Sequence, residues 1–241
     1  MIPRLGHSPE ANFPPPAEAL EEPDGLLAWG GDLSPKRLLR AYAHGIFPWY
    51  SEGDPILWWC PEQRCIMRTD QVHISRRLGR QLRQGSWQVT ADLAFDQVVS
   101  GCANTRTSTW IMPEMMQAYG QLHGLGHAHS IEVWDSGELI GGLYGVALGR
   151  MFFGESMYSA RSNASKVVLA QLCRVLHHWG FSWMDCQVPN PHLFRMGAQR
   201  ISRAQFLDGV RERVSRSRSP GSWTHRFGET LDQLGTWASP G

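Results

Sequence analysis

The chain has 241 residues, 42% of them hydrophobic, and a formal net charge of +1. This length fits one large domain or a small domain plus a medium one, and the hydrophobic content supports a sizeable core. No apolar run approaches the roughly 20 residues of a membrane helix, and the start MIPRLGHSPEANFPPP lacks the apolar segment of a signal peptide, so we expect a cytoplasmic protein. The five cysteines are scattered and odd in number, which argues against a disulfide framework.

The first 30 residues are rich in proline and weakly periodic. The motif GDLSP supplies a helix start, with Ser34 as N-cap and Pro35 at the first helical position, and the helix ends near Gly45. The segment IFPWYSEGDP is predicted to be a loop because two prolines and a glycine interrupt it. ILWW at 56–59 is predicted to be a short strand.

The segment HISRRLGRQLRQG at 73–85 predicts a helix with two different faces. Its apolar face repeats at a spacing of four and consists of Ile74, Leu78 and Leu82. The other face carries arginines with no acid among them: Arg76, Arg77, Arg80 and Arg83. A face of a single charge sign indicates contact with phosphates, and an ordinary solvated surface is the alternative.

The middle of the chain is predicted to contain a sheet rich in hairpins. Strands are expected at 129–134, 139–149 and 150–159, followed by a helix at 163–180 and a strand at 181–188. This order indicates an α+β, or mixed α/β, fold. Residues 215–241 are polar and interrupted by glycine and proline, so we expect a loosely held C-terminal tail.

Three polar residues stand out on apolar strands. Glu155 lies in FFGESMYS, while Asp185 and Gln187 lie in WMDCQV at positions i and i+2, where alternation places both side chains on one face. Buried polar groups are costly unless they are paired or used, so either a buried hydrogen-bond network or a functional site is indicated. His127 and His129 alternate along a strand but have no visible third partner, so we expect no metal site.

Over nearly its whole length the chain resembles the leucyl/phenylalanyl-tRNA–protein transferases. The resemblance runs through GLLAWGGDLSPKRLLRAYAHGIFPWYSEGDPILWWCP, TWI, HAHSIEVW, ELIGGLYGVALGRMFFGESMYS, NASK and DCQVPNPHLFRMGAQ. These strings are long, ordered and correctly spaced, whereas residues 87–104 and those after Leu207 match weakly.

The resemblance implies a small N-terminal domain, residues 1–62, and a larger C-terminal domain, residues 63–214, like the GCN5-type N-acyltransferases. It implies transfer of leucine or phenylalanine, and less well methionine, from aminoacyl-tRNA to proteins beginning with arginine or lysine, which marks them for degradation. No metal or nucleotide cofactor is expected, and we expect a monomer.

The resemblance also assigns roles to residues. Asp185 attracts and deprotonates or orients the acceptor amine, Gln187 holds the amine or ester in line, and Glu155 positions them or faces the cationic acceptor. By the same resemblance, Trp49 and Trp110 stack on the terminal adenosine of the tRNA. The arginine face at 76–83 would meet acceptor-stem phosphates. An apolar amino-acid pocket would be lined by Leu143, Phe152, Leu169, Leu172 and Met184.

Two other functions fit parts of the sequence. One is an acetyl-CoA-dependent N-acetyltransferase, although YSARSNASK lacks the glycine-rich turn that would hold a pyrophosphate. The other is a tRNA-binding module without catalytic activity, which the presence of Asp185, Gln187 and Glu155 argues against.

Overall fold

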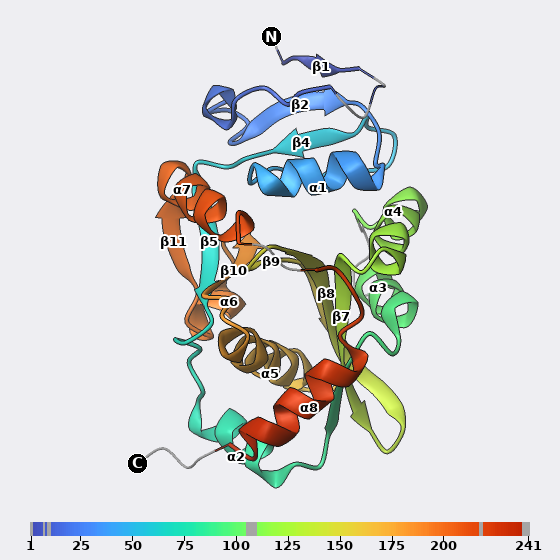
Figure 1. Cartoon of the computed structure of the whole chain (residues 1–241), viewed down its shortest axis with the longest axis vertical. Coiled ribbons are helices and arrows are strands. Elements are labelled where there is room, and N and C mark those ends of the chain that lie inside the picture. Colours follow the sequence, from blue (N-terminus) through green and yellow to red (C-terminus); the bar gives the residue numbers. More distant parts are fainter. Residues whose placement is uncertain (1, 7, 9–10, 105–109, 217–218, 238–241) are drawn as a thin grey trace.

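The computed structural model describes residues 2–6, 8, 11–104, 110–216 and 219–237, and two sheets organise them (Figure 1). Strands and helices alternate along the chain, which confirms the mixed α/β fold expected from the sequence. Within the described ranges, no helix is long and apolar enough to cross a membrane.

The smaller sheet comes from the first 60 residues and lies at one end of the molecule (Figure 1). Its strand order is β1 (Arg4–Leu5), β2 (Leu26–Gly30), β4 (Leu57–Trp59) and β3 (Phe47–Pro48). It is accompanied by the short helix η1 (Pro16–Glu18) and by α1 (Pro35–Ala43).

The predicted loop after α1 contains the two-residue strand β3, which the sequence interpretation missed. Phe47 pairs with Trp59, and Pro48 pairs with Trp58. Proline is tolerated here because β3 is the edge of its sheet, where a missing N–H breaks no ladder.

The larger sheet has seven strands, and β10 runs parallel to β9 while the other pairings are antiparallel. Its order is β11 (Gln199–Ser202), β5 (Gln63–Arg68), β10 (Trp183–Gln187), β9 (Met151–Ser159), β8 (Glu138–Leu148), β7 (Ala128–Asp135) and β6 (Gln88–Ala91). The division expected after residue 62 falls in the link between β4 and β5, and it remains a prediction of domain organisation.

Helices cover both faces of the larger sheet. Two apolar clusters result, because neighbouring residues of a strand point to opposite faces: Phe153 belongs to one cluster and Phe152 to the other. The helices that follow β5 are α2 (Arg76–Gln84), α3 (Phe95–Asn104), α4 (Pro113–Gly124), α5 (Ala164–His178), α6 (Pro191–Arg195), α7 (Arg203–Val214) and α8 (Thr224–Leu234).

The glycines of β8 allow helices to approach this strand from both sides. A Cβ atom at Gly141 would lie 2.6 Å from Ala164 of α5, and one at Gly142 would lie 2.7 Å from Val98 of α3. The glycines of β8 therefore serve helix packing.

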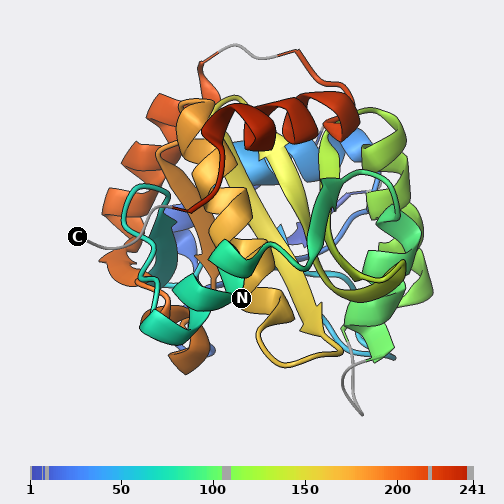
Figure 2. The same ribbon diagram turned by 90° about the horizontal axis from the view of Figure 1, so that it is seen from below.

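The expectation of a loosely held tail from residue 215 is wrong for its described part. Helix α8 lies across α5 (Figure 2), and Trp223 and Phe227 are 1% and 0% exposed. The backbone N–H of Trp223 donates to Asp92, and the Trp223 indole stacks on His129 with ring centres 3.8 Å apart. Residues 217–218 and 238–241 of the predicted tail lie outside the described residues.

Candidate active site

A cleft of about 300 Å³ opens where the C-terminal end of β10 meets β9 and the smaller sheet. Polar and aromatic side chains face each other across it. Its lining residues include Phe47, Trp49, Trp110, Glu155, Gln187 and Asn190.

An apolar side pocket of about 70 Å³ adjoins this cleft. The two hollows share Glu155, Ser156, Met157, Cys186 and Leu193 in their walls. The remaining lining residues of the side pocket are Leu143, Gly154 and Met184. This volume can hold a few groups the size of a water molecule, and Glu155 is the one carboxyl group among its described lining residues.

Glu155 lies on the common wall of the cleft and the side pocket and is held by three neighbours. Its Oε1 accepts hydrogen bonds from the Tyr42 hydroxyl and from Nε2 of Gln187, each 2.8 Å long. Its Oε2 accepts a bond from the Tyr119 hydroxyl, also 2.8 Å long. These partners come from α1, β10 and α4, so the carboxyl group joins three separate parts of the chain.

The environment of Glu155 favours its neutral form. Burial raises its pKa to about 7, against the lowering effect of the hydrogen bonds from Tyr42 and Tyr119. The nearby Asp185 raises the pKa further, while Arg64 lowers it. A carboxyl group with such a pKa can give or take a proton near neutral pH.

Asp185 does not face the cleft. It is 0% exposed and forms a bidentate ion pair with Arg64, which is also 0% exposed. Arg64 Nε donates to Oδ1 over 2.9 Å, and Nη2 donates to Oδ2 over 2.6 Å. The guanidinium lies between the rings of Phe47 and Phe206, 4.6 and 4.3 Å from their centres. The structure thus differs from the expectation that Asp185 meets the acceptor amine, because Arg64 occupies its carboxylate.

Gln187 points into the cleft because the strand is irregular at this residue. The register of β10 against β5 shifts between Asp185 and Gln187, and Gln187 has a φ of 59°, in the left-handed region that residues other than glycine seldom adopt. Its backbone N–H donates to Oδ1 of Asp185 over 2.9 Å. Asp185 therefore fixes the turn that presents the Gln187 carboxamide.

Two tryptophans stand at the mouth of the cleft. Trp49 is 43% exposed, although its backbone N–H donates to Leu57 and its carbonyl accepts from the Trp59 indole. Trp110 lies on the opposite segment, just before α4, and is half-buried. An exposed indole on a fixed backbone offers a stacking surface for a flat ligand.

The five apolar residues expected in one pocket divide into two groups. Leu143 and Met184 line the side pocket. Phe152, Leu169 and Leu172 line neither hollow; each is 0% exposed in the cluster beneath α5, where Phe152 packs against Trp223. The structure differs from the expectation for these three because the core encloses them.

The four arginines predicted on one face, Arg76, Arg77, Arg80 and Arg83, are all exposed on α2. We call them the α2 arginines. Three of them line a hollow of about 460 Å³ together with Trp237. In Figure 1, α2 lies at the end of the molecule opposite the smaller sheet.

Comparison with known proteins assigns the family. The model described as "Leucyl/phenylalanyl-tRNA protein transferase" matches residues 66–211, and that of its N-terminal domain matches residues 31–62. The chain belongs to the leucyl/phenylalanyl-tRNA protein transferase family. The family expected from the sequence is therefore confirmed.

Relatives of this transferase cover nearly the whole chain. A leucyl/phenylalanyl-tRNA–protein transferase of Xanthomonas euvesicatoria is 58% identical over 229 residues, which are 93% of this chain and 92% of that one. One from Alkalilimnicola ehrlichii is 54% identical, over 95% of this chain and 89% of its own. A GCN5-related N-acetyltransferase from Kribbella flavida is 9% identical with a TM-score of 0.38, over 70% of this chain and 61% of its own, and is too distant to carry an argument.

Three residues of the transferase site were missed by the sequence analysis. Arg64, Tyr42 and Tyr119 lie at the centre of the polar network, yet each is 0% exposed. The two tyrosines lie among apolar helix residues, where only their need for a hydroxyl partner distinguishes them from core. Within the described residues, histidine, cysteine, aspartate and glutamate side chains do not gather in a group that could hold a metal ion.

Proposed function

We propose that this transferase moves leucine or phenylalanine, and less well methionine, from aminoacyl-tRNA to the α-amine of proteins that begin with arginine or lysine. Relatives that share 58% of the sequence and carry the name leucyl/phenylalanyl-tRNA–protein transferase support this proposal most strongly. The product would be marked for degradation. Charged tRNA is made where proteins are synthesised, so we also propose that the enzyme acts in the cytoplasm.

The donor end of the tRNA fits the two hollows. Trp49 and Trp110 would stack on the terminal adenosine, for about 1–3 kcal/mol per base. The amino-acid side chain would then enter the side pocket between Leu143 and Met184. A branched or aromatic hydrocarbon suits this pocket, whereas a charged side chain would lose its hydration without gaining a partner. The ester carbonyl would lie near the wall that both hollows share.

The acceptor amine would meet Gln187. Because its Nε2 donates to Glu155, the carboxamide directs its Oε1 away from Glu155, and this oxygen can accept a hydrogen bond from the amine. Asp185 acts through Gln187, whose backbone it fixes. The proposal therefore makes Gln187 the residue that touches substrate and Asp185 a positioning residue.

The reaction depends more on orienting the amine and the ester than on activating either of them. An aminoacyl ester is already reactive, so no nucleotide cofactor is needed. An α-amine has a pKa near 8, so roughly a tenth of it is neutral at pH 7. Holding amine and ester together can lower the barrier by about 7–11 kcal/mol in favourable cases. Since one chain carries the whole site, a monomer would suffice.

The α2 arginines would hold the body of the tRNA. Exposed arginines of one sign neutralise phosphates without selecting a base sequence, so many tRNA sequences would be tolerated. The end of the same tRNA would then reach the two tryptophans at the cleft.

Transfer of labelled leucine tests this function. Leucyl-tRNA would be mixed with enzyme and with peptides that differ only in their first residue, arginine or glutamate. We expect transfer to the arginine peptide alone, and none from labelled acetyl-CoA. Acetyl transfer without leucyl transfer would instead identify an N-acetyltransferase, and binding of tRNA without either transfer would indicate a binding module.

A further inference from the structure

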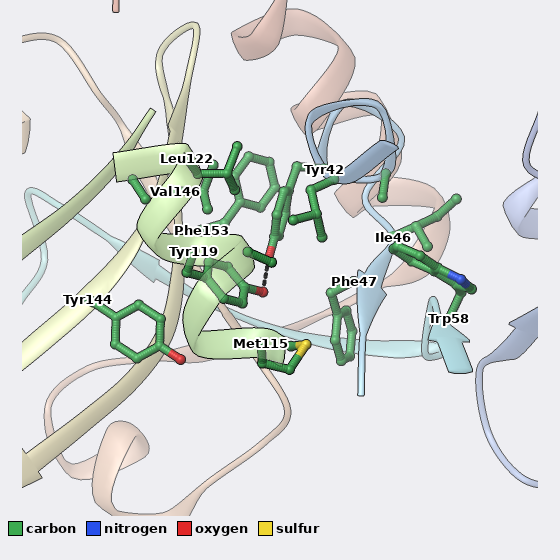
Figure 3. Packing of buried hydrophobic residues seen from close by; sticks show 14 of the residues in the cluster. Tyr42, Ile46, Phe47, Trp58, Met115, Tyr119, Leu122, Tyr144, Val146 and Phe153 are labelled. Atoms are coloured by element: carbon green, nitrogen blue, oxygen red, sulfur yellow. Dashed lines mark hydrogen bonds between the residues drawn. The ribbon is translucent and has the colours of Figure 1, made fainter. Parts of the chain in front are cut away.

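Three oxygen groups form a closed triangle beneath the cleft. The hydroxyls of Tyr42 and Tyr119 are 2.5 Å apart, and Figure 3 marks their hydrogen bond with a dashed line. Each hydroxyl also lies 2.8 Å from a different oxygen of Glu155. Both tyrosines are 0% exposed, so solvent does not reach their hydroxyls. Every side of the triangle is within hydrogen-bond distance, and each side therefore needs one hydrogen atom.

An ionised Glu155 does not supply enough hydrogens. Each tyrosine hydroxyl carries one, and a carboxylate carries none, so two hydrogens would serve three contacts. If both tyrosines donate to Glu155, their own oxygens face each other at 2.5 Å with nothing between them. If instead one tyrosine donates to the other, a lone pair faces the carboxylate at 2.8 Å. Either arrangement is repulsive.

A protonated Glu155 satisfies every contact. The carboxyl group then donates to one tyrosine, that tyrosine donates to the other, and the second donates back to the other carboxyl oxygen. The Gln187 Nε2 still donates to Oε1, which has a lone pair to accept it. The ring can run in either direction, so the acidic proton can reside on either oxygen of Glu155.

We propose that Glu155, Tyr42 and Tyr119 share three protons in a ring, and that this ring gives a proton to the departing ribose oxygen and takes one from the acceptor amine. This inference rests on the proposed aminoacyl transfer. It assigns a chemical task to Glu155, which lies on the wall between cleft and side pocket, and positioning roles to Tyr42 and Tyr119.

The proposed step balances without any further reactant. The neutral amine nitrogen attacks the ester carbonyl carbon, and the carbon–nitrogen bond forms as the carbonyl electrons move onto oxygen. When those electrons return, the bond to the ribose oxygen breaks, and that oxygen takes the proton of Glu155. The carboxylate left behind removes the extra proton from the new amide nitrogen. Glu155 ends protonated, as it began.

Every ionisable group around Glu155 bears on its titration. Tyr42 and Tyr119 donate to it from α1 and α4, Tyr144 faces it from β8, and Asp185 and Arg64 act on it from β10 and β5. Burial outweighs these neighbours and raises the pKa of Glu155 to about 7. The acid is the form required, so its contribution should be full well below pH 7 and be lost as pH rises through that value.

Infrared spectroscopy tests the proton count without any substrate. The wild-type protein should show the carbonyl band of a protonated carboxyl at pH 6, which disappears as the pH is raised to 8. Glu155→Gln should remove this band. Glu132 is the matched control because it is another buried carboxyl with a raised pKa, and Glu132→Gln should leave the Glu155 band in place. Absence of the band at pH 6 in the wild type would overturn the ring.

Single-turnover transfer tests the role of the ring. The ratio of wild-type to Glu155→Gln rates cancels the titration of the amine, which both enzymes share. We expect this ratio to be about 10²–10⁴ at pH 6 and to fall about tenfold per pH unit above 7. A ratio that does not change with pH would show that Glu155 transfers no proton.

The tyrosines supply variants that keep the carboxyl group. Tyr42→Phe and Tyr119→Phe each open the ring, and each should slow transfer about tenfold or more. Tyr144→Phe is the control because its buried hydroxyl has no hydrogen-bond partner among the described residues and its ring packs on Tyr119 (Figure 3). If Tyr42→Phe and Tyr119→Phe transfer the amino acid as fast as the control Tyr144→Phe, the ring is refuted. If even the wild type transfers nothing, the aminoacyl-transfer proposal fails while the infrared result still decides the proton count.

Discussion

Replacing Arg64 with methionine should expose how strongly the site depends on one buried ion pair. Both Arg64 and Asp185 are 0% exposed, so the variant leaves a carboxylate in the interior without its cation. Removing one partner of a buried pair costs about 3–5 kcal/mol. Methionine would keep contact with Phe47 and Phe206 but would lose the cation–π attraction to both rings. We therefore expect a loss of about 4 kcal/mol in the free energy of unfolding.

A double variant separates the charge from the packing. Arg64→Met combined with Asp185→Leu removes both charges, so no unpaired ion remains. The backbone N–H of Gln187 then loses its acceptor, which costs about 1–3 kcal/mol. The double variant should be more stable than either single variant, with a coupling energy of several kcal/mol.

Urea unfolding followed by tryptophan fluorescence measures these differences. With a slope of about 2 kcal/mol per molar urea, a 4 kcal/mol loss moves the midpoint by about 2 M. The double variant should fold and yet transfer leucine slowly, because the Gln187 turn has lost its anchor. The reasoning is refuted if either single variant loses under about 1 kcal/mol, or if the double variant loses the sum of both.

Three further changes test the donor site and the contacts with tRNA. Trp110→Ala should weaken the use of charged tRNA and of short aminoacyl-adenosine analogues alike, by about 1–3 kcal/mol each, in a comparison of kcat/KM; a normal analogue rate would assign Trp110 to structure or to another part of the tRNA. Neutralising the α2 arginines should flatten the dependence of log affinity on log salt by roughly 0.7–0.9 per lost phosphate contact. The exposed Arg211 of α7 is the control, and Arg211→Gln should leave the slope unchanged. A Cβ at Gly154 would lie 2.7 Å from the Met184 methyl, so Gly154→Ala should narrow the side pocket and reduce phenylalanine transfer more than leucine transfer, about tenfold in their ratio; an unchanged ratio would mean that another surface selects the amino acid.

The sequence identified the polar residues of the site but not their partners. Strand alternation predicts that Asp185 and Gln187 share a face, but it does not reveal that the register shifts between them or that Gln187 adopts a φ of 59°. The ion pair with Arg64 spans 121 positions of sequence, and local patterns carry no information at that distance. Composition likewise misled the interpretation of the tail, because its few apolar residues recur at helical spacing among polar ones: Trp223, Phe227, Leu231 and Leu234.

The residues predicted to line the amino-acid pocket show a second reason why the site could be predicted only in part. Hydrophobicity predicted correctly that residues such as Leu169 and Leu172 are buried. Whether a buried residue borders a hollow or fills the core depends on which layer faces it, and this is a property of the assembled sheet and helices. Leu143 and Met184 border the hollow because β8 and β10 lie on either side of β9 at the cleft.

Because Tyr42 contributes to the site, the part of the chain that carries the smaller sheet cannot be replaced freely by that of another protein. Its hydroxyl comes from α1, beside the smaller sheet, and reaches a carboxyl on the larger one. A chimera that joins the second part to a foreign first part would inherit an incomplete site unless that part also presents a hydroxyl at this point. During synthesis on the ribosome, the same contact forms only after residue 155 has emerged, so a chain interrupted before β9 cannot carry a partial activity.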